Sequence, residues 1–210
     1  QHHNQVSLWL KSSNNNGYSW SPEIEIPIPT SAGATLSRGS DAKIIKSERN
    51  LIVLWMSHVE GARFGSGPLV SMISPDEGKS WQQVSGPADW TQGPHGFFSL
   101  NNYKNITYAV WLDKRDAEIS VPGTQGLRYA YSMDSGKSWS KNITLDDTVC
   151  ACCWTTTKID SNGKLFVLYR DKQPSDMAIG VINNSDLKFT RLSTVGAFNW
   201  EFAGCPHIGG

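Results

Sequence analysis

The octapeptide Ser74-Pro75-Asp76-Glu77-Gly78-Lys79-Ser80-Trp81 returns 58 positions later as Ser132-Met133-Asp134-Ser135-Gly136-Lys137-Ser138-Trp139. A weaker copy at residues 13–20 begins 61 positions before the first and carries Asn15 in place of Asp. A fourth remnant, at residues 185–189, keeps Asp186 but has lost the glycine. Recurrence at this spacing predicts an array of similar modules, because internal periods of up to about 50 residues are typical of repeat architectures.

Each copy has the chemistry of a tight turn between two strands. An Asp side chain accepts hydrogen bonds from nearby backbone N–H groups, and Gly adopts a positive φ without steric strain. The Ser before Trp can close the turn through its hydroxyl, and the Trp begins the next strand. A calcium loop of the EF-hand type would need further oxygen ligands and a terminal Glu. We therefore expect structural roles for Asp76, Gly78, Trp81, Asp134, Gly136 and Trp139.

Runs rich in β-branched and aromatic residues surround these turns and predict four strands per module. The expected first strands are 41–46, 96–100 and 155–159, and the second strands are 50–55, 106–111 and 164–169. Third strands are expected at 68–73 and 126–131, and a fourth at 81–85. Four antiparallel strands joined by short turns make one propeller blade, so the sequence predicts an all-β fold, a β-propeller of four-stranded antiparallel blades.

The repeated Ser-x-Asp-x-Gly-x-Ser-Trp motif resembles the signature of the sialidase-like Asp-box (BNR-repeat) β-propeller family. The likeness extends over nearly the whole chain. Cys150-Ala151-Cys152-Cys153 together with Gly204-Cys205-Pro206 also resembles an uncharacterised bacterial subgroup of that family. Catalytic and non-catalytic proteins both carry such propellers, so the resemblance predicts the fold and leaves the activity open.

The length of the chain bears on the number of blades. At about 55 residues per blade, 210 residues make fewer than four blades, whereas the family that the chain resembles usually closes six. We expect residues 1–210 to form a single partial domain of about 3.5–4 blades, with a small closed four-blade ring as the alternative. The expected blades are 4–30 (half), 35–88, 93–146, 150–195 and the beginning of another at 203–210.

The composition argues against two classes of partner. Nineteen basic residues balance nineteen acidic ones, and no basic run suggests nucleic acid. No apolar stretch approaches the roughly 18 residues of a membrane span. We expect an extracellular or periplasmic protein. Among the nine tryptophans, Trp20, Trp55, Trp81, Trp111 and Trp139 fall at repeated positions and are expected in the cores, whereas Trp90, Trp154 and Trp200 are candidates for stacking on a sugar.

Three arginines follow the same strand in successive modules, namely Arg63, Arg115 and Arg170. They are expected on the end opposite the repeated turns, because antiparallel strands alternate ends. A guanidinium pairs bidentately with a carboxylate or sulfate. These arginines therefore form a candidate binding site for a glycan or another anionic small ligand, with His95 and Trp154 beside them. The alternative is that Arg115-Asp116 and Arg170-Asp171 form surface or interblade ion pairs.

The resemblance to sialidases implies further roles. In that family an arginine triad binds the sialic acid carboxylate, a Tyr activated by a Glu attacks the anomeric carbon, and an Asp acts as acid and base. The acid/base candidates here are Asp113, Asp116 and Asp171. The Arg-Ile-Pro segment typical of the first blade is absent, and no motif assigns the Tyr or the Glu.

The cysteines form a second group, which comprises Cys150, Cys152, Cys153 and Cys205. Equivalent positions in neighbouring blades would bring them together with His207. An even number of cysteines in an exported β protein favours disulfides, one of which would join the 150s to Cys205. The alternative is zinc or copper bound by the thiolates with His207 and His95, although Cys-x-Cys-Cys is not a standard zinc pattern. No other cofactor is expected.

Two functions of different class follow from these residues. The first is a sialidase-like glycoside hydrolase that acts on acidic terminal sugars, with the arginines as an anion clamp. The second is a noncatalytic propeller that binds glycan or protein on the same face. Turnover of a sialoside separates the two.

Overall fold

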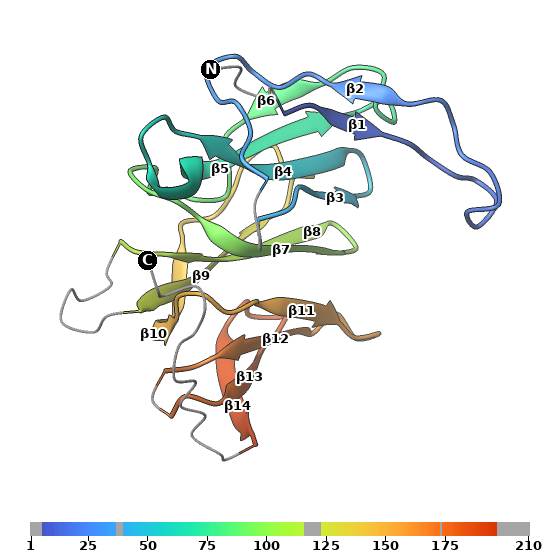
Figure 1. Cartoon of the computed structure of the whole chain (residues 1–210). Coiled ribbons are helices and arrows are strands. Elements are labelled where there is room, and N and C mark those ends of the chain that lie inside the picture. Colours follow the sequence, from blue (N-terminus) through green and yellow to red (C-terminus); the bar gives the residue numbers. More distant parts are fainter. Residues whose placement is uncertain (1–5, 37–39, 116–122, 173, 197–210) are drawn as a thin grey trace.

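A computed structural model describes residues 6–36, 40–115, 123–172 and 174–196. These residues form a two-stranded sheet and three four-stranded antiparallel sheets (Figure 1). The strands are β1 (Leu8–Leu10), β2 (Ile24–Ile26), β3 (Lys43–Lys46), β4 (Leu51–His58), β5 (Ser66–Ser74), β6 (Gln82–Val84), β7 (Gly96–Tyr103), β8 (Ile106–Asp113), β9 (Thr124–Ser132), β10 (Ile143–Cys150), β11 (Thr156–Ile159), β12 (Leu165–Arg170), β13 (Met177–Ile182) and β14 (Phe189–Val195). One short 3₁₀ turn, η1 (Arg63–Gly65), precedes β5. None of the described residues forms a helix long and apolar enough to cross a bilayer.

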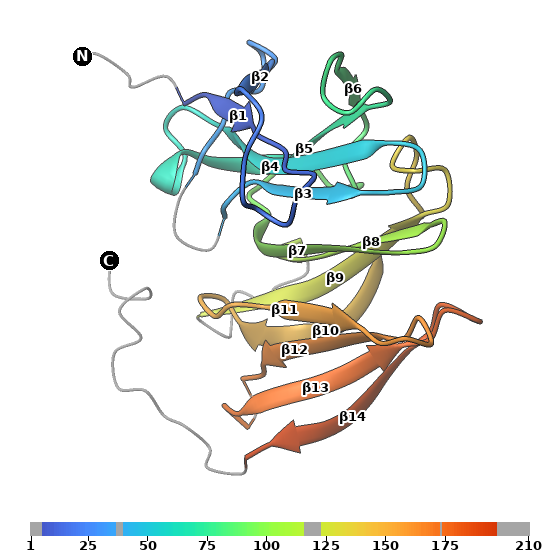
Figure 2. The ribbon, with the colours of Figure 1, turned by 90° about the vertical axis from the view of Figure 1, so that its right-hand side faces the viewer.

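Each large sheet follows the chain, in the orders β3-β4-β5-β6, β7-β8-β9-β10 and β11-β12-β13-β14. The sheets lie one after another, face to face, from the N-terminal to the C-terminal end of the chain (Figures 1 and 2). The innermost strands β3, β7 and β11 contact one another in turn. This is the blade arrangement that the sequence predicted, and the fold class is confirmed. The blade boundaries expected from sequence remain predictions.

The second strands β4 and β8 are buried on both faces, and this explains their nearly continuous apolar sequences, whereas β12 is fully buried on one face only. In β4, Val53 and Trp55 pack toward β1 and β2, whereas Leu54 and Met56 pack toward β7 and β8. β8 alternates in the same way, with Trp111 on the side of β4 and Val110 on the side of β12. The apolar layers between blades therefore form the core.

The repeated turns are closed by their Asp and Ser side chains. Asp76 Oδ1 accepts hydrogen bonds from the backbone N–H of Ser80 at 2.8 Å and from the Ser74 hydroxyl at 2.9 Å. The Ser80 hydroxyl donates to Asp76 Oδ2 at 2.6 Å, and the Gly78 N–H donates to Ser74 Oγ at 2.7 Å. Gly78 has a φ of 95°, which an L side chain rarely adopts.

The second copy repeats this geometry. The Ser138 N–H and hydroxyl donate to the two oxygens of Asp134 at 2.9 and 2.6 Å, and Gly136 has a φ of 84°. In the weaker copy Asn15 Oδ1 accepts the Ser19 N–H at 2.9 Å in the same way. An amide can thus replace the carboxylate, because the turn needs an acceptor more than a charge.

Each complete turn also packs on the preceding module. A Cβ at Gly136 would lie 2.8 Å from the side chain of Ile52, and one at Gly78 would lie 2.5 Å from Leu10. The Asn50 amide donates to the Ser135 carbonyl at 2.8 Å across the same interface. The glycines therefore serve both the turn and the contact between blades.

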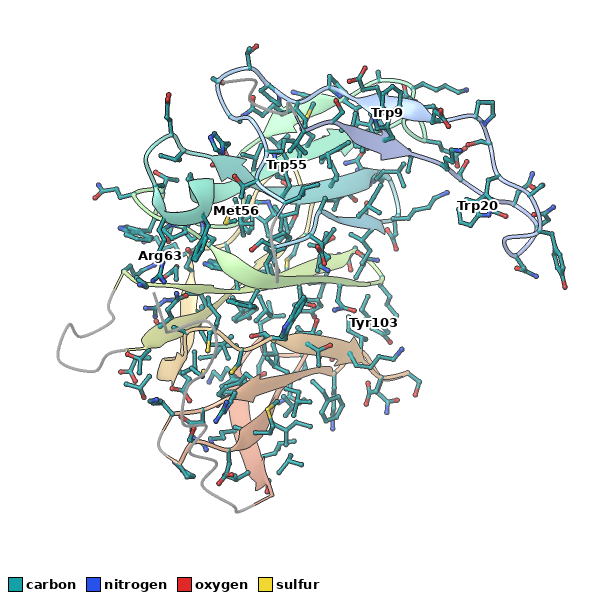
Figure 3. The ribbon with its side chains drawn as sticks, in the orientation of Figure 1. Trp9, Trp20, Trp55, Met56, Arg63 and Tyr103 are labelled. Atoms are coloured by element: carbon teal, nitrogen blue, oxygen red, sulfur yellow. The ribbon has the colours of Figure 1, made fainter. Side chains whose placement is uncertain are left out.

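Trp20 differs from the other repeated tryptophans. Trp55 and Trp111 are fully buried and Trp81 and Trp139 partly buried, as expected, but Trp20 is 61% exposed. Its hairpin projects from the body of the protein (Figure 3). The expectation that Trp20 lies in a core was wrong. The described residues include no module before this hairpin on which its turn could pack.

Other hydrogen bonds between blades join residues about one repeat apart. Ser99 Oγ and Thr157 Oγ1 lie 2.5 Å apart, and the Tyr129 hydroxyl donates to the Leu187 carbonyl at 2.6 Å. Both pairs are separated by 58 residues. The repeat in the sequence thus corresponds to one step from blade to blade.

Candidate functional site

The candidate residues lie where the second strands finish, an end of the sheets that we call the loop face. Because the strands are antiparallel, this end is opposite the repeated turns. Arg63 lies in η1, Arg115 follows β8 by two residues, and Arg170 is the last residue of β12. Figure 3 shows Arg63 at the end of the molecule away from Trp20 and Tyr103. The structure therefore brings all three arginines to the same face.

Arg115 is engaged by carboxylates of its own surroundings. Its Nη2 lies 2.7 Å from Asp113 Oδ2, and its Nη1 is ion-paired with Asp89. Nη2 also donates to Asn142 Oδ1 at 2.8 Å, and the guanidinium lies 5.9 Å from the centre of the Trp90 ring. Only 16% of the side chain is exposed. This geometry fits the ion-pair alternative, with Asp113 and Asp89 as partners of Arg115.

Asp113 is the centre of this cluster and has no exposed surface. Besides Arg115, it accepts the Trp111 indole N–H at 3.0 Å and pairs with Arg128 Nε at 3.3 Å. Burial alone raises the pKa of Asp113, but hydrogen bonds from Arg115 and Trp111 and the charge of Arg115 outweigh it, so the pKa is lowered. Asp113 is therefore held as a carboxylate.

The sequence analysis missed Arg128. It lies in the middle of β9, is 1% exposed and also donates to Thr144 Oγ1. A Cβ at Gly126 would collide with its guanidinium, so this glycine provides the space in which the arginine lies. The available signal was an arginine at an inward position of the apolar run 126–131, because arginine is almost never buried unless it is paired.

His95 is buried beneath this cluster. Its Nδ1 accepts the Leu69 N–H at 3.0 Å, and its ring packs edge-on against Trp90 and Trp111 at 5.8 and 6.3 Å. Burial lowers the pKa of His95 to about 4, so the imidazole is neutral at physiological pH. In this arrangement His95 is a packing and hydrogen-bonding element of the blade interface.

A second cluster joins β10, β12 and β14 around Asp171. Arg191 Nη1 lies 2.7 Å from Asp171 Oδ2 and 3.8 Å from Asp146 Oδ2. The Tyr169 hydroxyl donates to Asp146 Oδ2 at 3.1 Å. Burial, followed by the charge of Asp171, raises the pKa of Asp146. We call Asp146, Tyr169, Asp171 and Arg191 the two-carboxylate cluster.

Only Asp171 of this cluster was singled out from the sequence. Its side chain is 4% exposed and that of Asp146 13%, whereas the Arg191 side chain is 40% exposed and lies on the solvent side. Burial raises the pKa of Tyr169, and the neighbouring Asp146 raises it further. The phenol is thus a hydrogen-bond donor, not a phenolate.

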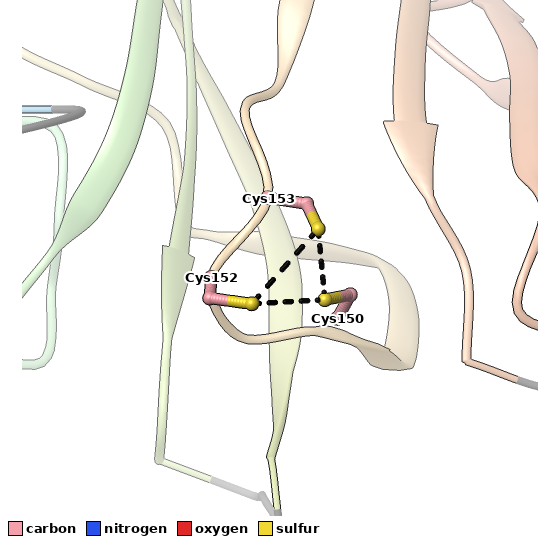
Figure 4. Close-up of side chains that lie close together, drawn as sticks. All are labelled: Cys150, Cys152 and Cys153. Atoms are coloured by element: carbon pink, nitrogen blue, oxygen red, sulfur yellow. Dashed lines mark hydrogen bonds between the residues drawn. The ribbon is translucent and has the colours of Figure 1, made fainter. Parts of the chain in front are cut away.

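Arg170 lies beside the cysteines of the connection between β10 and β11. Its Nη2 donates to Ser175 Oγ at 2.9 Å, and Nη1 lies 3.6 Å from Cys153 Sγ. The Sγ atoms of Cys150, Cys152 and Cys153 point toward one another (Figure 4), with separations of 3.4 Å for 150–152, 2.9 Å for 150–153 and 4.0 Å for 152–153. Cys150 and Cys152 are buried, and Cys153 is partly buried.

Trp154, the next residue, is 51% exposed, and its ring lies edge-on to Phe97 at 6.1 Å. Arg63 lies over the Phe64 ring at 4.9 Å, and Phe64 is 72% exposed. Among the described residues, Phe64 and Trp154 thus offer exposed aromatic rings to a ligand on the loop face. Asp116, Cys205 and His207 lie outside the described residues.

Comparison with solved structures identifies the fold. The K499G mutant of the NanB sialidase from Streptococcus pneumoniae aligns with a TM-score of 0.58 and 15% identity over 90% of this chain and 28% of its own. The E242A mutant of the α-L-arabinofuranosidase arb93a from Fusarium graminearum aligns with a TM-score of 0.56 and 16% identity over 92% of this chain and 62% of its own. The intramolecular trans-sialidase from Ruminococcus gnavus aligns with a TM-score of 0.56 and 15% identity over 91% of this chain and 41% of its own.

This chain therefore spans less than two thirds of the length of each of these three proteins. Neither a family model nor a curated protein matches it. At this level of identity the likeness concerns the backbone, and it agrees with the blade order described above. The chain has the fold of a sialidase-like β-propeller, of which the described residues form three four-stranded blades and one two-stranded sheet.

Proposed function

We propose that this propeller is a glycoside hydrolase of sialidase type that acts, outside the cytoplasm, on acidic terminal sugars of glycans. The observation that carries the proposal is the two-carboxylate cluster between the second and third blades, where Asp146 and Asp171 both lie within 4 Å of one nitrogen of Arg191. The glycosidases among the structural neighbours support a glycan as the ligand.

The two carboxyl groups have the unequal surroundings that glycoside hydrolysis requires. One group must hold a proton for the leaving oxygen, and the other must be ionised. Burial and the nearby Asp171 raise the pKa of Asp146, so Asp146 is proposed as the general acid. Asp171, paired with Arg191 at 2.7 Å, is proposed as the carboxylate that stabilises the cationic sugar or attacks it.

Binding of the sugar acid group is assigned to arginines around this cluster. Arg191 covers the two carboxylates and is 40% exposed, so it must turn outward to admit a sugar and can then pair with the acid group of that sugar. Arg170 lies next to Asp171 in the chain, and Trp154 offers an exposed ring for stacking. Arg63 remains an expected contact on the same face, whereas Arg115 has a structural place beside Asp113.

Fluorogenic sialosides and arabinofuranosides, assayed with matched variants, test the proposal. Asp146→Asn should lower kcat at least about 100-fold, because a positioned general acid contributes about 10²–10⁴-fold. Asp147→Asn is the matched control, since Asp147 is the next residue of β10 and is exposed. Equal activity of Asp146→Asn and wild type, or no turnover of any substrate, contradicts the proposal.

A noncatalytic glycan-binding propeller is the second candidate. The observation that favours it is the burial of Asp113 and Asp171, both of which are already paired with arginines. Retention on acidic glycans without turnover, weakened by Arg170→Ala, would establish this function in place of the first.

A further inference from the structure

We propose that Cys150, Cys152 and Cys153 are ligands of a thiophilic metal ion, with Zn²⁺ as the ion of choice. This site lies on the loop face but is independent of the proposed hydrolase activity. The inference begins from the convergence of three sulfur atoms from four consecutive residues.

The spacing of the sulfurs suits a tetrahedral metal. With a Zn–S distance of about 2.3 Å, two ligands of a tetrahedral site lie about 3.8 Å apart. The three Sγ–Sγ separations are 3.4, 2.9 and 4.0 Å, so small side-chain adjustments bring all three sulfurs to ligand positions. The described residues thereby supply three of the four positions of a tetrahedral centre.

The backbone holds the cysteines in this arrangement. Cys150 is the last residue of β10 and pairs with Thr124 of β9. The Ala151 N–H donates to the Gly123 carbonyl at 2.8 Å, and the preceding Val149 forms a bridge with Asp171 of the next blade. Because the residues at the start of this loop are held by two neighbouring blades, the loop has less conformational entropy to lose when a metal binds.

The charge of the thiolates would be balanced at this site. Cys150 and Cys152 are 5% and 7% exposed and Cys153 is partly buried, so three thiolates would place a large negative charge where little solvent reaches it. A divalent ion offsets most of that charge, and Arg170, whose Nη1 lies 3.6 Å from Cys153 Sγ, offsets more. Soft thiolate ligands select zinc or copper(I) over magnesium or calcium.

A disulfide explains the geometry less well. Three thiols can form at most one bond among themselves, so a Cys150–Cys153 disulfide would leave Cys152 buried in contact with it, at 3.4 Å from Cys150 Sγ. A metal gives all three sulfurs the same role. The pairing of the 150s with Cys205 that the sequence suggested involves a residue outside the described part of the chain.

Cobalt titration tests the site with the metal itself as the probe. The reduced, metal-free protein should bind one Co²⁺ with a thiolate-to-cobalt charge-transfer band in the near ultraviolet and with intense visible bands of tetrahedral cobalt, and Zn²⁺ should abolish both. Cys153→Ser should weaken Zn²⁺ binding more than about 100-fold, since loss of outer-shell partners alone costs about 10–100-fold. Ser175→Ala, which removes a partner of Arg170 and no sulfur, should keep the cobalt spectrum.

Thiol protection tests the same site without relying on a variant that must fold. Zn²⁺ should slow the alkylation of Cys150, Cys152 and Cys153 in the native protein, and a chelator should restore it, as peptide mass spectrometry can record for each cysteine. A native disulfide among these cysteines, or free thiols that bind neither ion, overturns the proposal. Tight binding of Cu⁺ by a protein that binds neither Zn²⁺ nor Co²⁺ also overturns the choice of zinc.

Discussion

Replacement of Asp113 by Asn tests whether the carboxylate is a structural centre or a catalytic group. Asn has nearly the same shape but removes the charge that faces Arg115 at 2.7 Å and Arg128 at 3.3 Å. Asp113 has no exposed surface and Arg128 is 1% exposed, so water cannot replace the lost charge. Removal of one partner from a buried ion pair costs about 3–5 kcal/mol, and we expect the free energy of unfolding to fall by that amount.

Urea unfolding of the wild type and of Asp113→Asn at neutral pH measures this loss. Asp89→Asn is the matched control, because it removes the other carboxylate on Arg115 but at a side chain that is 50% exposed, and it should cost at most about 1 kcal/mol. A loss below 1 kcal/mol for Asp113→Asn, equal to that of the control, would refute the structural role.

The pH dependence of the same variant gives a second measurement. The folded-state pKa of Asp113 is lowered, so the ionised carboxylate contributes to the stability of the fold above the unfolded pKa of about 3.9. It is lost as pH falls through the folded pKa. The difference in stability between the wild type and Asp113→Asn should therefore shrink in acid. A difference that grows in acid would contradict the sign of the shift.

Three further outcomes are expected. Gly136→Ala should lower the free energy of unfolding by about 1–3 kcal/mol more than Gly61→Ala in thermal or urea unfolding. Both glycines have a positive φ, but only a side chain at Gly136 would meet a neighbouring blade. Equal losses in the two variants would contradict the interblade contact. Hydrogen bonds from Ser80 lower the pKa of Asp76 to about 2. In thermal melts Asp76→Asn should therefore be less stable than the wild type above the unfolded pKa, and this difference should vanish between about pH 4 and pH 2. A difference that does not depend on pH would argue against these bonds. Tyr129→Phe should cost about 1 kcal/mol in urea unfolding, since it removes the bond to the Leu187 carbonyl, and no loss would show that the bond contributes nothing.

The blades were predictable from the sequence because their determinants are local. The turn residues Asp134 and Gly136 act within six residues of one another, and the second strands β4 and β8 are recognisable because both of their faces are buried. The prediction that Trp20 is buried failed for a non-local reason, because burial of this side chain depends on a neighbouring module and not on its own motif.

The candidate site was predictable only in part. The loop face followed from the antiparallel order of the strands, whereas the closeness of Cys150, Cys152 and Cys153 follows from their adjacency in the chain. The partners of the charged groups did not, because Arg128 reaches Asp113 from the adjacent strand β9, and Arg191 reaches Asp171 from β14, two strands away from β12. The spacing of the motifs predicts at which end of a strand a side chain lies. It does not predict which carboxylate a long arginine side chain pairs with, because that depends on packing in three dimensions.

The bonds between residues one repeat apart have a consequence for how the protein unfolds. Each blade is secured by its neighbours, through contacts such as Ser99 with Thr157 and Tyr129 with Leu187, so stability is a sum of blade terms and interface terms, as in other repeat proteins. Loss of order should start at an exposed end and spread blade by blade. Amide exchange in heavy water would then be slowest in β8, which has a blade on either side, and fastest in the β1–β2 hairpin.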